Sequence, residues 1–133
     1  MKKRIVFLFI PVVICVMCII TSDRITNDEL EYYTEINSLI KDMEFYTANI
    51  EETQITFFDD NNSIISTMHF DFFDPKVDLI YIRKEGDSIF FIINANIDDE
   101  SGVVFMNGGS DYILNGIVSL KRVGGNSYQF DSR

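Results

Sequence analysis

The chain has 133 residues, 47% of them hydrophobic, with 12 Phe and 6 Tyr but no Trp, and this composition predicts one folded domain rather than a disordered acidic tail. Its 21 acidic and 11 basic residues give a net charge of −10, which argues against nucleic acid and against an anionic membrane surface as partners. Basic proteins or cations suit this charge better.

The chain begins with a basic cluster, residues 2–4, followed by an apolar run from Ile5 to Ile20 that contains no charge. Cations before an apolar run are typical of a transmembrane helix whose N-terminus is cytoplasmic, and also of a cleaved signal peptide. Sixteen helical residues cover roughly 24 Å of a hydrocarbon core of about 30 Å, and snorkelling cations can close that gap. We therefore predict a single-pass membrane anchor at residues 1–22 and an extracytoplasmic domain at residues 23–133.

Two alternatives to the uncleaved anchor are a secreted protein and a lipid-anchored protein. The sequence Ile20-Thr21-Ser22 only approximates a cleavage site, which prefers small residues. Cys15 and Cys18, the only cysteines, lie inside the apolar run, and neither follows the small residue that is typical before a lipidated Cys. Their C-x-x-C spacing indicates redox chemistry only in a soluble helix beside a strand, so we interpret both as small apolar side chains. The domain outside therefore depends on its core rather than on a disulfide.

The first predicted element of the domain is a long amphipathic helix. Thr26 and Glu29 have the spacing of a capping box, in which each side chain bonds the other's backbone N–H. Apolar residues then recur at steps of three and four, which predicts a helix from Asn27 to Glu52. Such a wide stripe favours packing on the sheet of the same domain, with a partner helix as the alternative. The stripe consists of Leu30, Tyr33, Ile36, Ile40, Met43, Tyr46 and Ile50.

After Glu52 the hydrophobic period changes from 3.6 to 2, which predicts strands. We expect Val77 to Lys84 and Ser88 to Ile97 at the centre of the sheet, and Val103 to Met106 and Ser127 to Phe130 at its edges. The remaining predicted strands are residues 54–58, 63–70 and 117–123. The predicted fold class is α+β, with an N-terminal transmembrane helix, then one amphipathic helix packed on an antiparallel sheet of six to seven short strands.

No catalytic or cofactor-binding motif is present, because the sequence lacks G-x-S-x-G, H-E-x-x-H, P-loop and G-x-G-x-x-G patterns. His69 is the only histidine and has no second ligand or nucleophile at a useful spacing, so we expect it at a half-buried strand edge. We predict neither an enzyme nor a cofactor.

The polar set around Asn96, Asp98 and Glu100 is similar to the start of a calcium loop. The pattern then departs, because Asp99 stands where the loop requires Gly and Phe105 stands where it requires a bidentate acid. These three residues are therefore weak metal candidates, and an acidic solvated turn is the simpler interpretation.

The features together predict a membrane-anchored, non-enzymatic domain that acts in protein interaction or assembly, bound to the membrane through Ile5–Ile20 and to a protein partner. One alternative is a cation-binding or sensor accessory domain. Another is structural, because the layout resembles that of type IV pilin-like subunits: an apolar N-terminal helix, an amphipathic continuation and an antiparallel sheet. That family has a Gly before the cleaved bond and a Glu within the apolar run. In this chain Lys3-Arg4-Ile5 replaces the Gly, and no acid occurs before Asp23.

Overall fold

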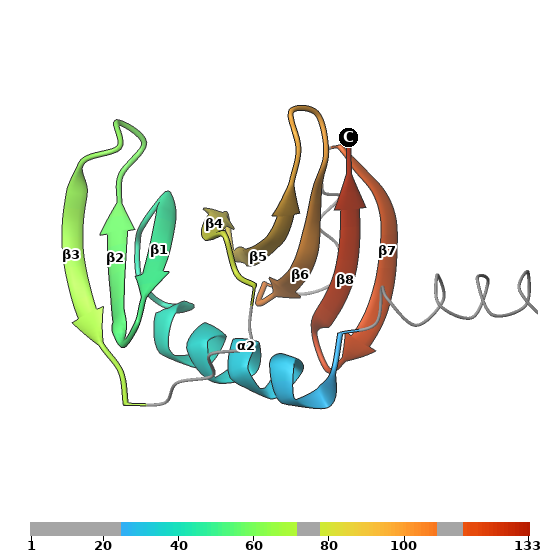
Figure 1. The fold of residues 1–133 in the computed structure, drawn as a ribbon, viewed down its shortest axis with the longest axis horizontal. Helices are drawn as coiled ribbons and strands as arrows, with labels where there is room; N and C mark the ends of the chain where they lie inside the picture. Colours follow the sequence, from blue (N-terminus) through green and yellow to red (C-terminus); the bar gives the residue numbers. More distant parts are fainter. Residues whose placement is uncertain (1–24, 72–77, 109–115) are drawn as a thin grey trace, which may run out of the picture. The chain divides into compact units, whose positions relative to one another are not determined.

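The computed structural model describes residues 25–71, 78–108 and 116–133. The chain divides into two compact units, Met1–Leu30 and Glu31–Arg133, and the second unit contains the whole sheet. Within the described ranges there is one helix, α2 (Asn27–Ile40), and eight strands (Figure 1). The strands are β1 (Thr47–Glu51), β2 (Gln54–Phe58), β3 (Ile64–His69), β4 (Tyr81–Glu85), β5 (Ser88–Ala95), β6 (Glu100–Met106), β7 (Ile117–Gly124) and β8 (Ser127–Ser132).

The predicted capping box at the start of the helix is confirmed. The N–H of Glu29 donates to Thr26 Oγ1 at 3.2 Å, and the N–H of Thr26 donates to Glu29 Oε2 at 3.1 Å. These two bonds satisfy backbone donors that have no partner within the first turn of a helix.

The predicted C-terminus of this helix is wrong, because α2 ends at Ile40 and not at Glu52. The end is stabilised from a distant strand: Lys84 Nζ on β4 donates to the carbonyl oxygens of Lys41 at 3.1 Å and Met43 at 2.5 Å. These two carbonyls lie just after the helix, where a cation also complements the negative end of the helix dipole.

The strand that the sequence did not predict is β1, which lies within the range that we predicted as helix. Its residues also alternate, with Ala48 and Ile50 less exposed than Asn49 and Glu51. The segment therefore fits a strand as well as a helix, and pairing with β2 decides between them. Glu52, in the connection to β2, adopts the left-handed conformation that usually favours glycine, with φ of 53°. The connection contains no glycine.

The strands form one antiparallel sheet in the order β3-β2-β1-β4-β5-β6-β8-β7. β4 and β5 lie at the centre, as predicted from their composition. The prediction that β6 and β8 form edges is wrong, because each has a neighbour on both sides; the edges are β3 and β7. The predicted six to seven strands are also too few, since the described ranges contain eight.

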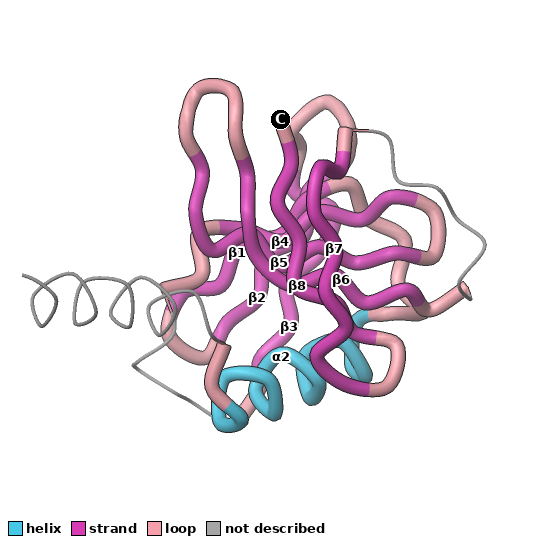
Figure 2. The backbone as a smooth tube through the Cα atoms, turned by 90° about the vertical axis from the view of Figure 1, so that its right-hand side faces the viewer, coloured by secondary structure: helices cyan, strands magenta, loops and turns pink. Residues whose placement is uncertain are grey.

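Hydrophobic side chains cover both faces of the sheet at β5, where residues 88–92 are all buried. On the face next to α2, Tyr33 packs against Phe91 with ring centroids 5.0 Å apart. Residues 31–40 of the helix belong to the same unit as the sheet, and both views show them running beside the strands (Figure 1 and Figure 2). On the opposite face Phe90 meets Phe130 edge-on at 5.2 Å. That cluster consists of Phe90, Ile92, Val104, Met106 and Phe130.

The predicted transmembrane helix is the second error in the fold class. No helix in the described ranges is long and apolar enough to cross a membrane, and α2 has 14 residues. The apolar run Ile5–Ile20 that carried the prediction lies outside the described residues. The export and orientation that we inferred from that run stay predictions.

Candidate functional site

The β3 edge of the sheet is the first candidate site. β3 has the sequence Ile-Ile-Ser-Thr-Met-His, pairs with β2 and has no strand on its other side in the described part of the chain. An edge strand presents a row of backbone donors and acceptors, which can pair with a strand from another chain. β3 carries neither a lysine nor a proline, two residues that commonly protect such edges.

The register of β3 identifies the backbone groups that face outward. The N–H of Phe70 donates to the carbonyl of Thr53 at 2.9 Å, and the ladder continues through the pairs Ile55–Met68 and Phe57–Ser66. Because hydrogen-bonded and non-hydrogen-bonded residues alternate along an antiparallel strand, the N–H and C=O groups of Thr67 and His69 point away from β2. These four groups form the pairing surface of the edge.

The side chains of β3 are also accessible. Ile64 is 67% exposed and Ile65 51% exposed, and His69 is exposed as well. The register shifts between Phe57 and Phe58, so a bulge at Ile65 bends the start of β3 and leaves the later residues as its regular part. The prediction for His69 is correct in placing it on an edge strand, although the side chain is more exposed than we expected.

The opposite edge, β7, differs from β3 in two respects. It contains Lys121 and Arg122, both exposed, and its pairing with β8 is irregular at two places. Charged side chains and bulges are the features that prevent edge-to-edge association. The two edges are therefore unequal, and β3 is the more open to strand pairing.

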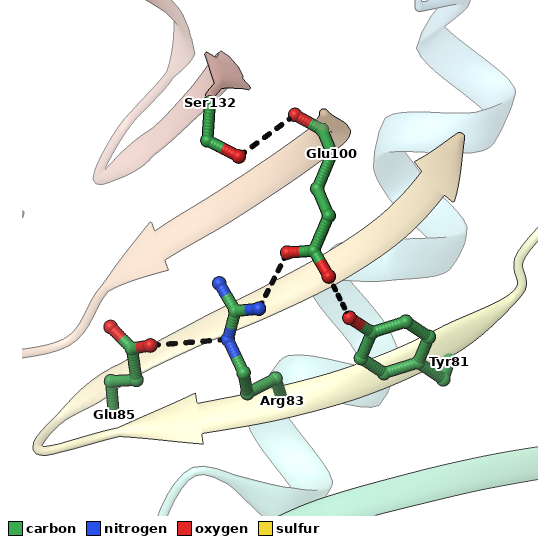
Figure 3. A network of polar contacts seen from close by, with 5 residues as sticks. All are labelled: Tyr81, Arg83, Glu85, Glu100 and Ser132. Carbon is green, nitrogen blue, oxygen red and sulfur yellow. Dashed lines mark hydrogen bonds and ion pairs between the residues drawn. The ribbon is translucent and has the colours of Figure 1, made fainter. Parts of the chain in front are cut away.

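The second candidate site is a polar cluster on the face opposite α2, centred on Glu100 of β6 (Figure 3). Its carboxylate accepts a hydrogen bond from the Tyr81 hydroxyl and forms an ion pair with Arg83 Nη1 at 2.5 Å. Arg83 Nε lies 3.1 Å from a Glu85 oxygen but makes no hydrogen bond there. The guanidinium carbon stands 4.9 Å from the centre of the Phe90 ring, a cation–π contact.

This cluster perturbs two pKa values. Burial, together with the hydrogen bond and charge of Glu100, raises the pKa of Tyr81 from 10.0 to about 12. Burial by itself lowers the pKa of Arg83, but the hydrogen bond and charge of Glu100, together with the charges of Glu85 and Tyr81, outweigh it, so that pKa lies above its ordinary value. Both groups therefore hold their protons at neutral pH, and neither is available as a general base.

Two shallow clefts flank the cluster, with volumes of about 380 and 330 Å³. They share Asn96, Asp99, Glu100, Ser132 and Arg133. Their walls are mostly polar, whereas small-molecule sites are usually lined by apolar side chains that bury the ligand.

The three weak metal candidates lie at this end of the sheet. Asn96 and Asp98 are exposed in the turn between β5 and β6, and Glu100 is half-buried with its carboxylate bound by Arg83 and Tyr81. Within the described residues no three His, Cys, Asp or Glu side chains are grouped so that they could hold a metal ion.

Sequence reasoning did not identify Tyr81 and Arg83, which lie on β4, two strands away from Glu100 in the sheet. Their alternate positions on one strand were a signal that they share a face. No family model matches the chain, and comparisons with curated proteins and with solved structures found no match either.

Proposed function

We propose that this protein is a non-enzymatic interaction module that binds an extended segment of a partner protein by strand addition at β3. The observation that supports this function best is the inequality of the two edges. β3 contains no Lys, Arg, Asp or Glu and has outward-facing backbone groups at Thr67 and His69, whereas β7 carries Lys121 and Arg122 and has two pairing irregularities against one in β3. Strand addition derives affinity from main-chain hydrogen bonds and specificity from alternate side chains.

The side chains around the edge support the same mode of binding. Ile64 and Ile65 provide exposed apolar surface at one end of β3, and β-branched residues of this kind fit a pleated surface that becomes half-buried. The helix stripe is already used, because Tyr33, Ile36 and Ile40 are buried in the domain's own core. The β3 edge is therefore a better docking surface than the helix stripe.

The test is a selection of extended peptides from a random display library on the full chain, followed by binding to two proline variants. Thr67→Pro removes an outward N–H without removing a bond to β2, so the fold should persist while pairing is blocked. Leu120→Pro is the matched control on β7. The bond from Met106 N–H to the Asn126 carbonyl fixes the alternation there, and it directs the N–H of Leu120 away from β8.

We expect selected peptides to bind the wild-type chain and Leu120→Pro but not Thr67→Pro. Hydrogen exchange gives an independent readout, because the His69 amide should exchange rapidly in the free protein and slowly in the complex. Equal binding by Thr67→Pro would place the peptide elsewhere. Failure to select any peptide, or a His69 amide already protected in the free protein, would contradict strand addition.

A further inference from the structure

Resting on strand addition at β3, we infer that the partner's paired segment is an uncharged strand with Lys or Arg residues on both sides of it. The chemistry that points to such a partner is the charge around the edge. Residues 47–71, which contain β1, β2 and β3, include five acids and no Lys or Arg. The acids are Glu51, Glu52, Asp59, Asp60 and Asp71.

Two of these acids lie beside the Ile64 end of the edge, in the turn from β2 to β3. Asp59 holds the turn together, because its Oδ1 accepts hydrogen bonds from the N–H groups of Asn61 at 3.0 Å and Ser63 at 2.8 Å. The next acid, Asp60, is exposed. A strand that pairs with β3 would therefore end beside a carboxylate that faces solvent.

Asp71 lies beside the His69 end, and Glu51 and Glu52 lie further in from the edge. His69 pairs with Gln54, and Gln54 pairs in turn with Glu51, so β2 separates the connection from β1 to β2 from this end of the edge. Glu51 and Glu52 are exposed. Asp71, two residues after His69, is exposed as well. Carboxylates thus stand at both ends of a strand that is itself uncharged.

The length of β3 sets the spacing of the partner's cations. Six residues of a strand span about 20 Å at roughly 3.3 Å per residue, and that exceeds the Debye length of about 8 Å at physiological ionic strength. Each end therefore acts separately, and the partner needs cations at both ends, about six residues apart. Complementary charges at the rim of an interface mainly speed association and select the partner.

The same charges disfavour a second copy of the chain as the occupant. Two β3 edges paired with each other would bring together two segments of five acids each without a cation from either segment. Like charges that face each other across an interface disfavour the complex. A basic partner segment instead converts the same acids into favourable ion pairs.

The experiment uses one strand-forming core from the peptide selection, synthesised with two Lys, two Ser or two Glu residues on each side. Binding to the full chain is measured at low and at physiological salt concentration. We expect the Lys-flanked peptide to bind most tightly and the Glu-flanked peptide least tightly. The difference should shrink as salt increases, because exposed charges are screened.

Charge variants of the protein locate the effect. The double variant Asp60→Asn with Asp71→Asn removes one exposed acid from each end. It should lower the affinity for the Lys-flanked peptide on the order of threefold to tenfold, because exposed ion pairs are individually weak. The affinity for the Ser-flanked peptide should not change. Glu31→Gln with Glu35→Gln is the matched control, because it removes two exposed acids from the helix instead.

The outcomes separate this inference from the proposed function. Equal binding of all three peptides, with the His69 amide protected each time, would overturn the basic flanks and leave strand addition standing. An equal loss of affinity in both double variants would show that only net charge matters, and would also overturn the inference. If none of the peptides protects the His69 amide, both proposals are wrong.

Discussion

Tyr81 is the residue whose chemistry the fold changes most measurably. Its hydroxyl donates to Glu100, and burial with that contact raises its pKa to about 12. Since the folded state binds this proton more tightly than the unfolded state, whose pKa is near 10, Tyr81 contributes stability that is complete below about pH 10. That contribution decreases as the pH rises toward 12.

We predict that Tyr81 titrates near pH 12, as measured by the difference in phenolate ultraviolet absorbance between the wild type and Tyr81→Phe. In Glu100→Gln the same pKa should fall toward 10, because the substitution removes the carboxylate that accepts the bond and repels the phenolate. Circular dichroism recorded over the same pH range checks that the sheet is still folded. Titration of Tyr81 near its ordinary pKa of 10 would contradict the network in Figure 3.

At the scale of elements, the end of α2 depends on one side chain from the sheet. Lys84 donates to two carbonyl oxygens just after the helix and stands 5.7 Å from the centre of the Phe45 ring. Replacing it with Met keeps much of its apolar length but removes both hydrogen bonds. We expect Lys84→Met to lower the free energy of unfolding by about 1 to 2 kcal/mol, measured by urea denaturation.

Lys121→Met is the control for that change, because Lys121 is exposed on β7 and should contribute less than about 0.5 kcal/mol. Hydrogen exchange adds a local readout: the amides of Lys41 and Met43 should exchange faster in Lys84→Met only. Equal destabilisation by the two substitutions would mean that Lys84 acts through net charge rather than through the helix end.

The same element explains how far sequence reasoning reached. Local signals were sufficient for the capping box at Thr26 and for seven strands, because capping and period-2 alternation are carried by neighbouring residues. The stop at Ile40 was not predictable, since Lys84, which bonds the carbonyl of Lys41 just after the helix, is 43 residues from Lys41 in the sequence. Thr47–Glu51 fits both periods, and only its neighbours β2 and β4 make it a strand.

The candidate sites were predicted less well than the strands, for a related reason. Which strand lies at an edge depends on the order of the whole sheet, and β8 lies between β6 and β7 instead of following its sequence order. The sequence placed Glu100 in an acidic turn without its partners. Arg83 and Tyr81 reach it only because the β4–β5–β6 pairing places their side chains on the same face.

At the scale of the whole molecule, the net charge of −10 acts on stability as well as on partners. Self-repulsion between exposed acids destabilises the compact state, and added salt screens it. We therefore expect the urea midpoint to rise between about 0.01 and 0.15 M NaCl, as the Debye length falls from about 30 to 8 Å. The gain in the free energy of unfolding should be on the order of 1 kcal/mol.

Calcium chloride at the same ionic strength tests whether that gain is general screening or ion binding at the turn between β5 and β6. We expect the two salts to stabilise equally, because Glu100, the third of the metal candidates, has its carboxylate bound by Arg83 and Tyr81. A calcium ion there would have to displace Arg83 and leave a half-buried guanidinium without its main counter-charge. An extra gain with calcium that disappears in Asp98→Asn would contradict this and would make Asn96, Asp98 and Glu100 a cation site.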